Sequence, residues 1–270
     1  MPNDSPAAPD LPKAETLRLD RRGAALWITL NRPAKRNALS RPLLAELSAA
    51  AAALHGDATI RLVVVTGAGA RSFAAGGDLA DLAAVRDLAD AAAMARDARR
   101  ALDALRDWPV PVVAALNGDA LGGGAELAAA CDFRIAAHHA RIGFIQGRLA
   151  IATAWGGGPD LIDLVGARTA LRLLSRQEVL DPSEAAALGL YDHVAAEGEA
   201  LADAIARYCA PMLALPPQVL RTFKRLAIAR RAGTPRAGLV ELETALFAET
   251  WVHPDHWSAV DALLAGRRAG

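Results

Sequence analysis

The sequence Asn117-Gly-Asp-Ala-Leu-Gly-Gly-Gly-Ala-Glu-Leu127 links the apolar run Val112–Leu116 to an alanine-rich segment that ends near Cys131. The apolar run predicts a buried strand, whereas the segment from Ala125 predicts a helix. Glycines at such a junction let backbone N–H groups point into a cavity, and the start of the helix adds the positive end of its dipole. The stretch therefore predicts a strand, a loop and a helix, with a loop suited to binding an oxyanion.

A second glycine cluster lies upstream of this one. Arg61–Thr66 is a short β-branched run that predicts a buried strand, and Ala75-Gly-Gly-Asp78 follows it after a short connection. Either cluster alone is explained by a tight turn. The pair, with the carboxylate of Glu126 two residues beyond the second cluster, favours a functional site, because two converging N–H groups make an oxyanion hole.

The remaining segments favour an α/β protein built from crossover units rather than a β-sandwich. The elements expected in chain order are a hairpin over 16–20 and 25–30, a helix capped by Ser40, a helix over about 81–107, a strand over 133–137, and helices over 202–214, 218–231 and 235–251. This pattern predicts a disordered lead-in over 1–14, a core over 15–199 and a helical C-terminal subdomain over 200–270.

Composition excludes several classes of function. The chain has 270 residues, and its 30 Lys and Arg balance 30 Asp and Glu, so nucleic acid is a poor candidate for a partner. No apolar run is long enough for a membrane helix, and the N-terminus does not resemble a signal peptide, which predicts a cytoplasmic protein without a membrane partner. Cys131 and Cys209 have no metal-binding or redox spacing, so no metal site is expected.

The common motifs of catalysis and nucleotide binding are largely missing. The sequence has no HExxH, GxSxG or GxxxxGK[ST] pattern. Gly67-Ala-Gly-Ala-Arg-Ser72 follows a strand, but Ser72 replaces the third glycine of a dinucleotide motif and no helix signal begins there. A dinucleotide-dependent oxidoreductase is therefore a poor option.

Several segments resemble the enoyl-CoA hydratase/isomerase, or crotonase, family. The segments that match in order and approximate spacing are Leu30–Leu39, Val63–Gly67 with Phe73–Leu79, Asn117–Leu127 with Cys131-Asp132, and Asp181–Val194. The resemblance implies a ClpP-like spiral of repeated ββα units, with C-terminal helices that assemble a homotrimer or a dimer of trimers. It also implies an acyl-CoA thioester as substrate, and no cofactor beyond the coenzyme A that the substrate carries.

The same resemblance implies roles for individual residues. Gly77 and Gly123 match the residues whose N–H groups hold the thioester oxygen as it becomes an enolate. The coenzyme A arm is expected beside the matching residues Lys35, Arg36, Ala38, Ala74, Ala75 and Gly76. Lys35 and Arg36 are equally compatible with solvated surface charges.

The acid/base positions depart from the hydratase pattern. Hydratases of the family resemble one another in having two glutamates that flank a water. Glu126 occupies the first position, whereas Gln146 falls at the second. An amide cannot take or give the proton, so activation of water by two carboxylates is impaired and Glu126 is expected to remain as the acid/base or substrate-orienting group. Asp160, at the start of a later helix, is expected to cap that helix.

The segment around Trp155 resembles the ethylmalonyl-CoA decarboxylase branch of the family, which has an SWGG-like stretch at this place. Three functions therefore remain open. One is a general lyase or isomerase of the family that works through a thioester enolate. The second is a decarboxylase of a methylmalonyl- or ethylmalonyl-CoA, and the third is an acyl-CoA binder without turnover. Trp155 is also explained by core packing alone.

Overall fold

The computed structural model describes residues 10–268, so most of the expected lead-in lies outside the described residues. The contacts divide the chain into two compact units, the first ending at Cys209 and the second beginning at Ala210. All strands among the described residues belong to the first unit, and the second is helical. Within this described part of the chain, no helix combines the length and the hydropathy needed to cross a bilayer.

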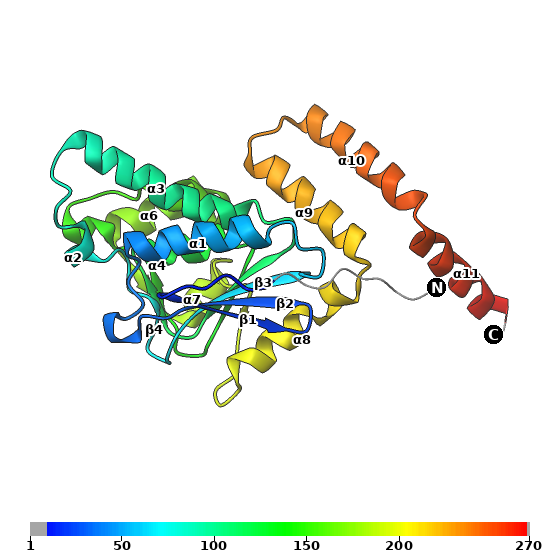
Figure 1. Ribbon diagram of the computed structural model, residues 1–270, viewed down its shortest axis with the longest axis horizontal. Helices are drawn as coiled ribbons and strands as arrows, with labels where there is room; N and C mark the ends of the chain where they lie inside the picture. Colours follow the sequence, from blue (N-terminus) through cyan, green and yellow to red (C-terminus); the bar gives the residue numbers. More distant parts are fainter. Residues whose placement is uncertain (1–9, 269–270) are drawn as a thin grey trace. The chain divides into compact units, whose positions relative to one another are not determined.

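A six-stranded sheet forms the centre of the first unit (Figure 1). Its strands lie in the order β1 (Leu17–Arg22), β2 (Ala25–Leu30), β3 (Leu62–Gly67), β5 (Val112–Leu116), β7 (Phe133–Ala136) and β10 (His193–Val194). β1 and β2 form the expected antiparallel hairpin, and every later neighbour pairs in parallel. β5 is buried along its whole length, as is usual for a parallel strand covered on both faces.

A smaller sheet of four short strands accompanies the first. Its order is β4 (Ser72–Ala74), β6 (Asp119–Leu121), β8 (Ile142–Gly143) and β9 (Val179–Leu180). β4, β6 and β8 each come directly after a strand of the larger sheet and before a helical segment. A unit of two strands and a helical segment therefore recurs along the chain. Because β4, β6 and β8 are neighbours in the small sheet, successive units lie side by side.

Besides the start of α8 (Leu201–Ala214), the first unit has seven α-helices among the described residues, some packed on the sheets and others on neighbouring helices. They are α1 (Arg41–Leu54), α2 (Leu79–Leu82), α3 (Leu88–Arg106), α4 (Gly123–Ala130), α5 (Gly157–Val165), α6 (Ala167–Arg176) and α7 (Pro182–Ala187). α1 and α3 lie side by side over the large sheet (Figure 1). As expected, Ser40 caps α1, and its Oγ accepts the Leu43 N–H at 3.4 Å.

The single helix expected over about 81–107 is wrong in one respect. The chain forms two helices there, because Asp78 caps α2 and Asp87 starts a new helix by accepting the Asp90 N–H at 2.8 Å. Leu82, at the end of α2, and Met94, in α3, both line a pocket described below.

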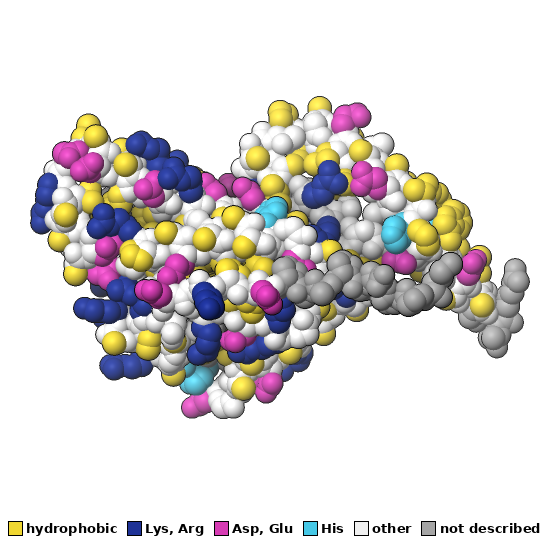
Figure 2. Space-filling view, in the orientation of Figure 1, with side chains coloured by type: hydrophobic (Ala, Val, Ile, Leu, Met, Phe, Trp, Pro, Cys, Tyr) yellow, Lys and Arg dark blue, Asp and Glu magenta, His cyan; other side chains and the backbone are white. Residues whose placement is uncertain are grey.

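The second unit consists of the end of α8 (Leu201–Ala214) and of α9 (Pro217–Arg231), α10 (Arg236–Trp251) and α11 (Pro254–Arg268). The pattern analysis predicted the first three of these helices and missed α11. Large apolar side chains remain exposed on this unit, and Figure 2 shows hydrophobic atoms gathered over α10 and α11. They are Phe223, Val240, Phe247, Trp251, Val252, Trp257, Leu263 and Leu264.

Candidate active site

Two glycine loops meet at the start of α4. Gly122, whose φ of 54° suits glycine, turns the chain from β6 into the helix, and its carbonyl accepts the N–H groups of Ala125 and Glu126. Gly76, from the first cluster, lies against this turn. A Cβ added to Gly76 would be 3.6 Å from the Gly123 nitrogen and 3.3 Å from the Leu121 oxygen.

The structure brings Gly77 and Gly123 to this junction. Gly77 forms an isolated parallel bridge with Leu39, in which the neighbouring Gly76 carbonyl and Asp78 N–H make the hydrogen bonds. Gly123 is the first residue of α4, where the N–H has no acceptor within the helix. Among the described residues, neither the Gly77 N–H nor the Gly123 N–H has an acceptor. Two adjacent donors are thus available to an oxygen atom of a ligand.

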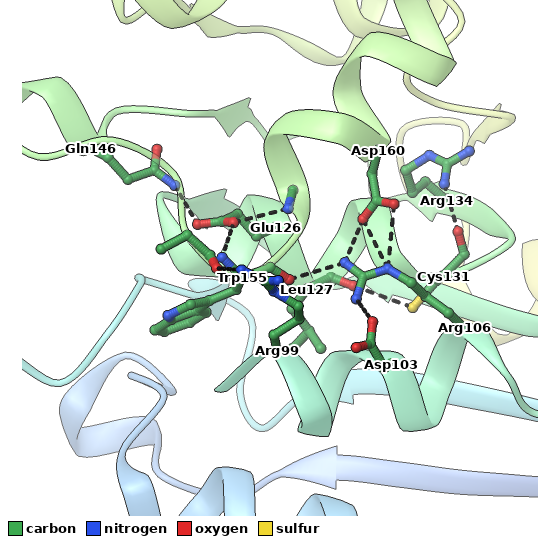
Figure 3. Close-up of polar contacts among 12 residues, drawn as sticks. Arg99, Asp103, Arg106, Glu126, Leu127, Cys131, Arg134, Gln146, Trp155 and Asp160 are labelled. Atoms are coloured by element: carbon green, nitrogen blue, oxygen red, sulfur yellow. Dashed lines mark hydrogen bonds and ion pairs between the residues drawn. The ribbon is translucent and has the colours of Figure 1, made fainter. Parts of the chain in front are cut away.

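Glu126 lies one turn into α4 and is 2% exposed. Its Oε1 accepts from Gln146 Nε2 at 2.8 Å, and its Oε2 accepts from the N–H groups of Trp155 at 2.9 Å and Gly157 at 3.0 Å. Figure 3 shows the carboxylate between Gln146 and the Trp155 backbone. The expected neighbourhood of Glu126 and Gln146 is therefore present, with the amide acting as a hydrogen-bond donor.

Opposing influences act on the ionisation of Glu126. Burial raises the pKa of Glu126 above its ordinary value, whereas the hydrogen bonds from Trp155, Gly157 and Gln146 act in the opposite direction. Gln146 is itself buried, and its Oε1 has no hydrogen-bond partner among the described residues. One acceptor in the immediate surroundings of Glu126 is therefore unused.

The peptide group of Trp155 is held on both sides. Its N–H donates to Glu126, and its C=O accepts from Arg106 Nη2 at 3.1 Å (Figure 3). Arg106 also donates to Asp160 at 2.6 Å and to Asp103 at 2.6 Å. Burial alone would lower the pKa of Arg106, but the two carboxylates raise it, so this buried guanidinium stays charged.

The expectation that Asp160 caps a helix is wrong. The N-cap of α5 is Gly156, which makes no side-chain cap, and Asp160 lies in the first turn with its carboxylate on Arg106. The physical reason is the burial of Arg106, which requires a nearby counterion. Sequence reasoning missed Arg106 because its partners lie in a neighbouring turn and in a helix 54 positions away.

The carboxylates nearest the first glycine cluster are also bound to arginine. Asp78, next to Gly77, accepts from Arg32 Nη2 at 2.7 Å, and this bond holds the pKa of Asp78 below its ordinary value. Arg32 also donates to the Ala38 carbonyl at 2.6 Å. Asn37 is fully buried and ties the same loop to the Ala68 and Ser72 carbonyls. The Arg32–Ala38 loop is therefore fixed against the first glycine cluster.

Two pockets flank the glycine junction. One of about 210 Å³ is lined by Arg36, Arg71, Ser72, Ala75, Asp119 and Leu121. It contains two of the residues expected along a coenzyme A arm, Arg36 and Ala75, and it adds Arg71, which the sequence did not single out. Of the other residues expected there, Lys35 is exposed, Ala38 is half-buried, and Ala74 and Gly76 are buried under the loop.

The second pocket, of about 410 Å³, is predominantly apolar. It is lined by Leu39, Arg41, Leu44, Ala45, Ser48, Leu82, Met94, Asp97, Ala98, Arg100 and Trp155. Leu82 and Trp155 also touch the glycine junction, because a Cβ added to Gly77 would be 3.1 Å from Leu82 Cδ1 and 3.5 Å from Trp155 Cη2. The glycine junction thus adjoins both a small pocket that carries two arginines and Asp119 and a larger apolar pocket.

Comparisons with known proteins agree with this architecture. Ethylmalonyl-CoA decarboxylase of Danio rerio is 33% identical over 91% of this chain and 82% of the relative. Crotonyl-CoA hydratase of Syntrophomonas wolfei is 37% identical over 69% of this chain and 72% of the relative. The crystal structure of enoyl-CoA hydratase from Bacillus anthracis superposes with a TM-score of 0.86 at 29% identity, covering 93% of this chain and 97% of that one.

These similarities confirm the expected crotonase-type fold, an α/β core followed by a C-terminal helical region. The family model named Enoyl-CoA hydratase/isomerase matches residues 20–264, which is nearly the whole described chain. The protein therefore belongs to the enoyl-CoA hydratase/isomerase family and is an acyl-CoA-processing enzyme.

Proposed function

We propose that this enzyme forms a thioester enolate by decarboxylating an alkylmalonyl-CoA, with methylmalonyl-CoA and ethylmalonyl-CoA as the nearest substrates. The observation that carries the proposal is the Gln146–Glu126 hydrogen bond beside two unpaired glycine amides. The site retains the donors that stabilise an enolate. It has an amide where a second acid would be needed to activate water.

The Gly77 and Gly123 N–H groups bind the thioester oxygen. In the proposed step, the bond between the α-carbon and the substrate carboxylate breaks, and its electron pair forms the enolate. Carbon dioxide leaves, and a proton from water then reaches the α-carbon to give the shorter acyl-CoA. Negative charge accumulates on the thioester oxygen, where each preorganised donor is worth on the order of 3 kcal/mol in the transition state.

Hydration requires more of the carboxylates than this site provides. Glu126 already accepts three hydrogen bonds, so its lone pairs are largely occupied. Asp78 and Asp160 are engaged in ion pairs with Arg32 and Arg106, so neither is a free carboxylate for activating water. We therefore assign Gln146 to orienting Glu126, and Glu126 to holding the backbone of Trp155 and Gly157.

The coenzyme A portion is proposed to lie over the pocket of Arg36 and Arg71. Two guanidinium groups at a small pocket suit phosphate groups, and the carboxylate of Asp119 in the same lining is neutralised by Arg141. This pocket adjoins the glycine junction through Ala75 and Leu121. Lys35 and Ala38 extend the same surface. The acyl group then points to the opposite side of the amides, toward Trp155 and Leu82.

The test is product analysis by mass spectrometry after separate incubation with crotonyl-CoA, methylmalonyl-CoA and ethylmalonyl-CoA. Loss of carbon dioxide from a malonyl-type thioester, with crotonyl-CoA unchanged, is the expected result. Gain of water on crotonyl-CoA at enzymatic rates would refute the proposal and show that Glu126 suffices for hydration. Tight binding of all three thioesters with no turnover would refute it in favour of a binding protein.

Gly123→Ala is the variant that separates catalysis from binding in this assay. The new Cβ would be 2.3 Å from Trp155 Cζ3, so the Gly123 backbone and the ring cannot keep their present positions. We expect a loss of about 100-fold or more in kcat, since one oxyanion donor is displaced. Gly56→Ala is the matched control, because its added Cβ meets nothing within 4 Å.

A further inference from the structure

The indole of Trp155 lies against both glycines whose amides are unpaired, and at Gly77 it does so beside Leu82. A Cβ added to Gly123 would be 2.3 Å from its Cζ3 and 2.8 Å from its Cη2, and one added to Gly77 would be 3.5 Å from Cη2. All of these atoms belong to the six-membered ring. The outer edge of the indole therefore lies against both glycines that would hold the thioester oxygen.

Trp155 is held rigidly in this position. Its side chain is almost entirely covered, with the residue 7% exposed. Its N–H is bound by Glu126 and its C=O by Arg106, and both of these side chains are buried. These hydrogen bonds fix the backbone of Trp155, and the close packing around its buried indole opposes rotation of the side chain. The indole therefore forms a packed wall beside the two glycines.

The same ring lines the apolar pocket on its other side. Trp155 and Leu82 contact the glycine junction and also line the pocket, which continues past Leu44, Met94 and Ala98 under α1 and α3. The pocket volume of about 410 Å³ is within the range of small-ligand sites. Trp155 and Leu82 therefore lie where the glycine junction meets this space.

We propose that Trp155 is a specificity-determining residue whose indole limits how far an acyl group bound at the Gly77 and Gly123 amides extends into the apolar pocket, so that short acyl-CoA thioesters are selected. The inference rests on the proposed function of this site. Shortening the ring at position 155 opens the passage. Each further buried methylene then adds affinity by about fourfold.

The test compares dissociation constants for butanoyl-CoA and octanoyl-CoA, measured by isothermal titration calorimetry, in the wild type, Trp155→Phe and Trp155→Ala. Wild type is expected to favour butanoyl-CoA. The ratio of the dissociation constant for butanoyl-CoA to that for octanoyl-CoA is expected to rise by about tenfold or more in Trp155→Ala. The rise should be smaller in Trp155→Phe, whose ring is shorter than the indole. Trp27→Phe, in β2 and outside both pockets, is the matched control.

Equal changes in affinity for both thioesters in the Trp155 variants would overturn the proposal, because a packing role predicts no change in chain-length preference. If Trp155→Ala does not fold, Trp155→Phe decides: a chain-length ratio equal to that of Trp27→Phe overturns the proposal. Saturated thioesters are used because their binding needs no turnover. Failure of the alkylmalonyl-CoA assay would refute the proposed reaction while leaving this comparison intact.

Discussion

Replacing Glu126 by alanine and by glutamine should have very different consequences for stability. In Glu126→Ala, the N–H groups of Trp155 and Gly157 lose the acceptor that they share in a buried site. Each unsatisfied buried donor costs about 1–3 kcal/mol, so we expect a loss of about 2–6 kcal/mol in the free energy of unfolding. The cavity left by the side chain adds to this cost.

Glutamine at position 126 can preserve every hydrogen bond. Its oxygen can accept from Trp155 and Gly157, and its NH₂ group then faces Gln146. Because the Gln146 oxygen is buried without a partner, a rotation of that amide supplies the missing acceptor. We therefore expect Glu126→Gln to change the free energy of unfolding by less than about 1 kcal/mol.

The pH dependence supplies an independent check. Burial raises the folded-state pKa of Glu126 above its ordinary value of 4.5. A carboxyl whose folded pKa is raised contributes stability that is fully present below the unfolded pKa and is lost as pH rises through the folded pKa. Glutamine does not titrate, so the stability of Glu126→Gln relative to wild type should increase as pH rises from 4.5.

Urea unfolding, followed by circular dichroism at several pH values, measures both effects. If Glu126→Ala is as stable as Glu126→Gln within about 0.5 kcal/mol, the reasoning fails. The N–H groups of Trp155 and Gly157 would then be reaching water or another acceptor in Glu126→Ala. A relative stability of Glu126→Gln that is flat from pH 4.5 to 8 would contradict the raised pKa.

Three further predictions concern packing, charge and a thiol. Arg106→Met should lower the free energy of unfolding by about 3–5 kcal/mol, because Asp160 loses its guanidinium partner and the Trp155 carbonyl loses a donor. Urea titration measures this loss, and a value below about 1 kcal/mol would contradict the buried ion pair. Gly124→Ala should destabilise far more than Gly56→Ala, because its Cβ would be 2.0 Å from the Ala74 carbonyl oxygen; equal melting temperatures would count against this close approach. Burial raises the pKa of Cys209 to about 11, so iodoacetamide at pH 8 should label it only after denaturation, and mass spectrometry that finds rapid labelling of the folded protein would show it to be accessible.

Local patterns predicted most of the backbone. The hairpin, the Ser40 cap and strand β5 follow from alternation, cap chemistry and β-branched runs over a few residues. The interruption between α2 and α3 was missed because alanine-rich sequence suits a helix throughout, and the caps at Asp78 and Asp87 decide the boundaries. Helix α11 was missed because the apolar residues of its sequence do not recur at a clear helical spacing.

The candidate site could be predicted only in part. Gly77, Gly123, Glu126 and Gln146 were found through motifs, and the structure brings them to neighbouring positions. The contacts of Trp155 could not be predicted, because they depend on the side chain reaching across to a loop 78 positions upstream in the chain. Arg106 and Asp160 likewise become partners only when α3 and α5 are packed, so neither residue carries a local signal.

The amide at position 146 also simplifies the acid–base behaviour of this site. A carboxylate in its place would lie within hydrogen-bonding distance of Glu126, and two such groups share protons and titrate in two coupled steps. Enzymes that need one group protonated and another deprotonated show bell-shaped activity profiles. With glutamine at position 146, Glu126 ionises without a coupled carboxylate. A plot of activity against pH should therefore change on one side only. On the other side, activity should stay level for as long as the fold is stable.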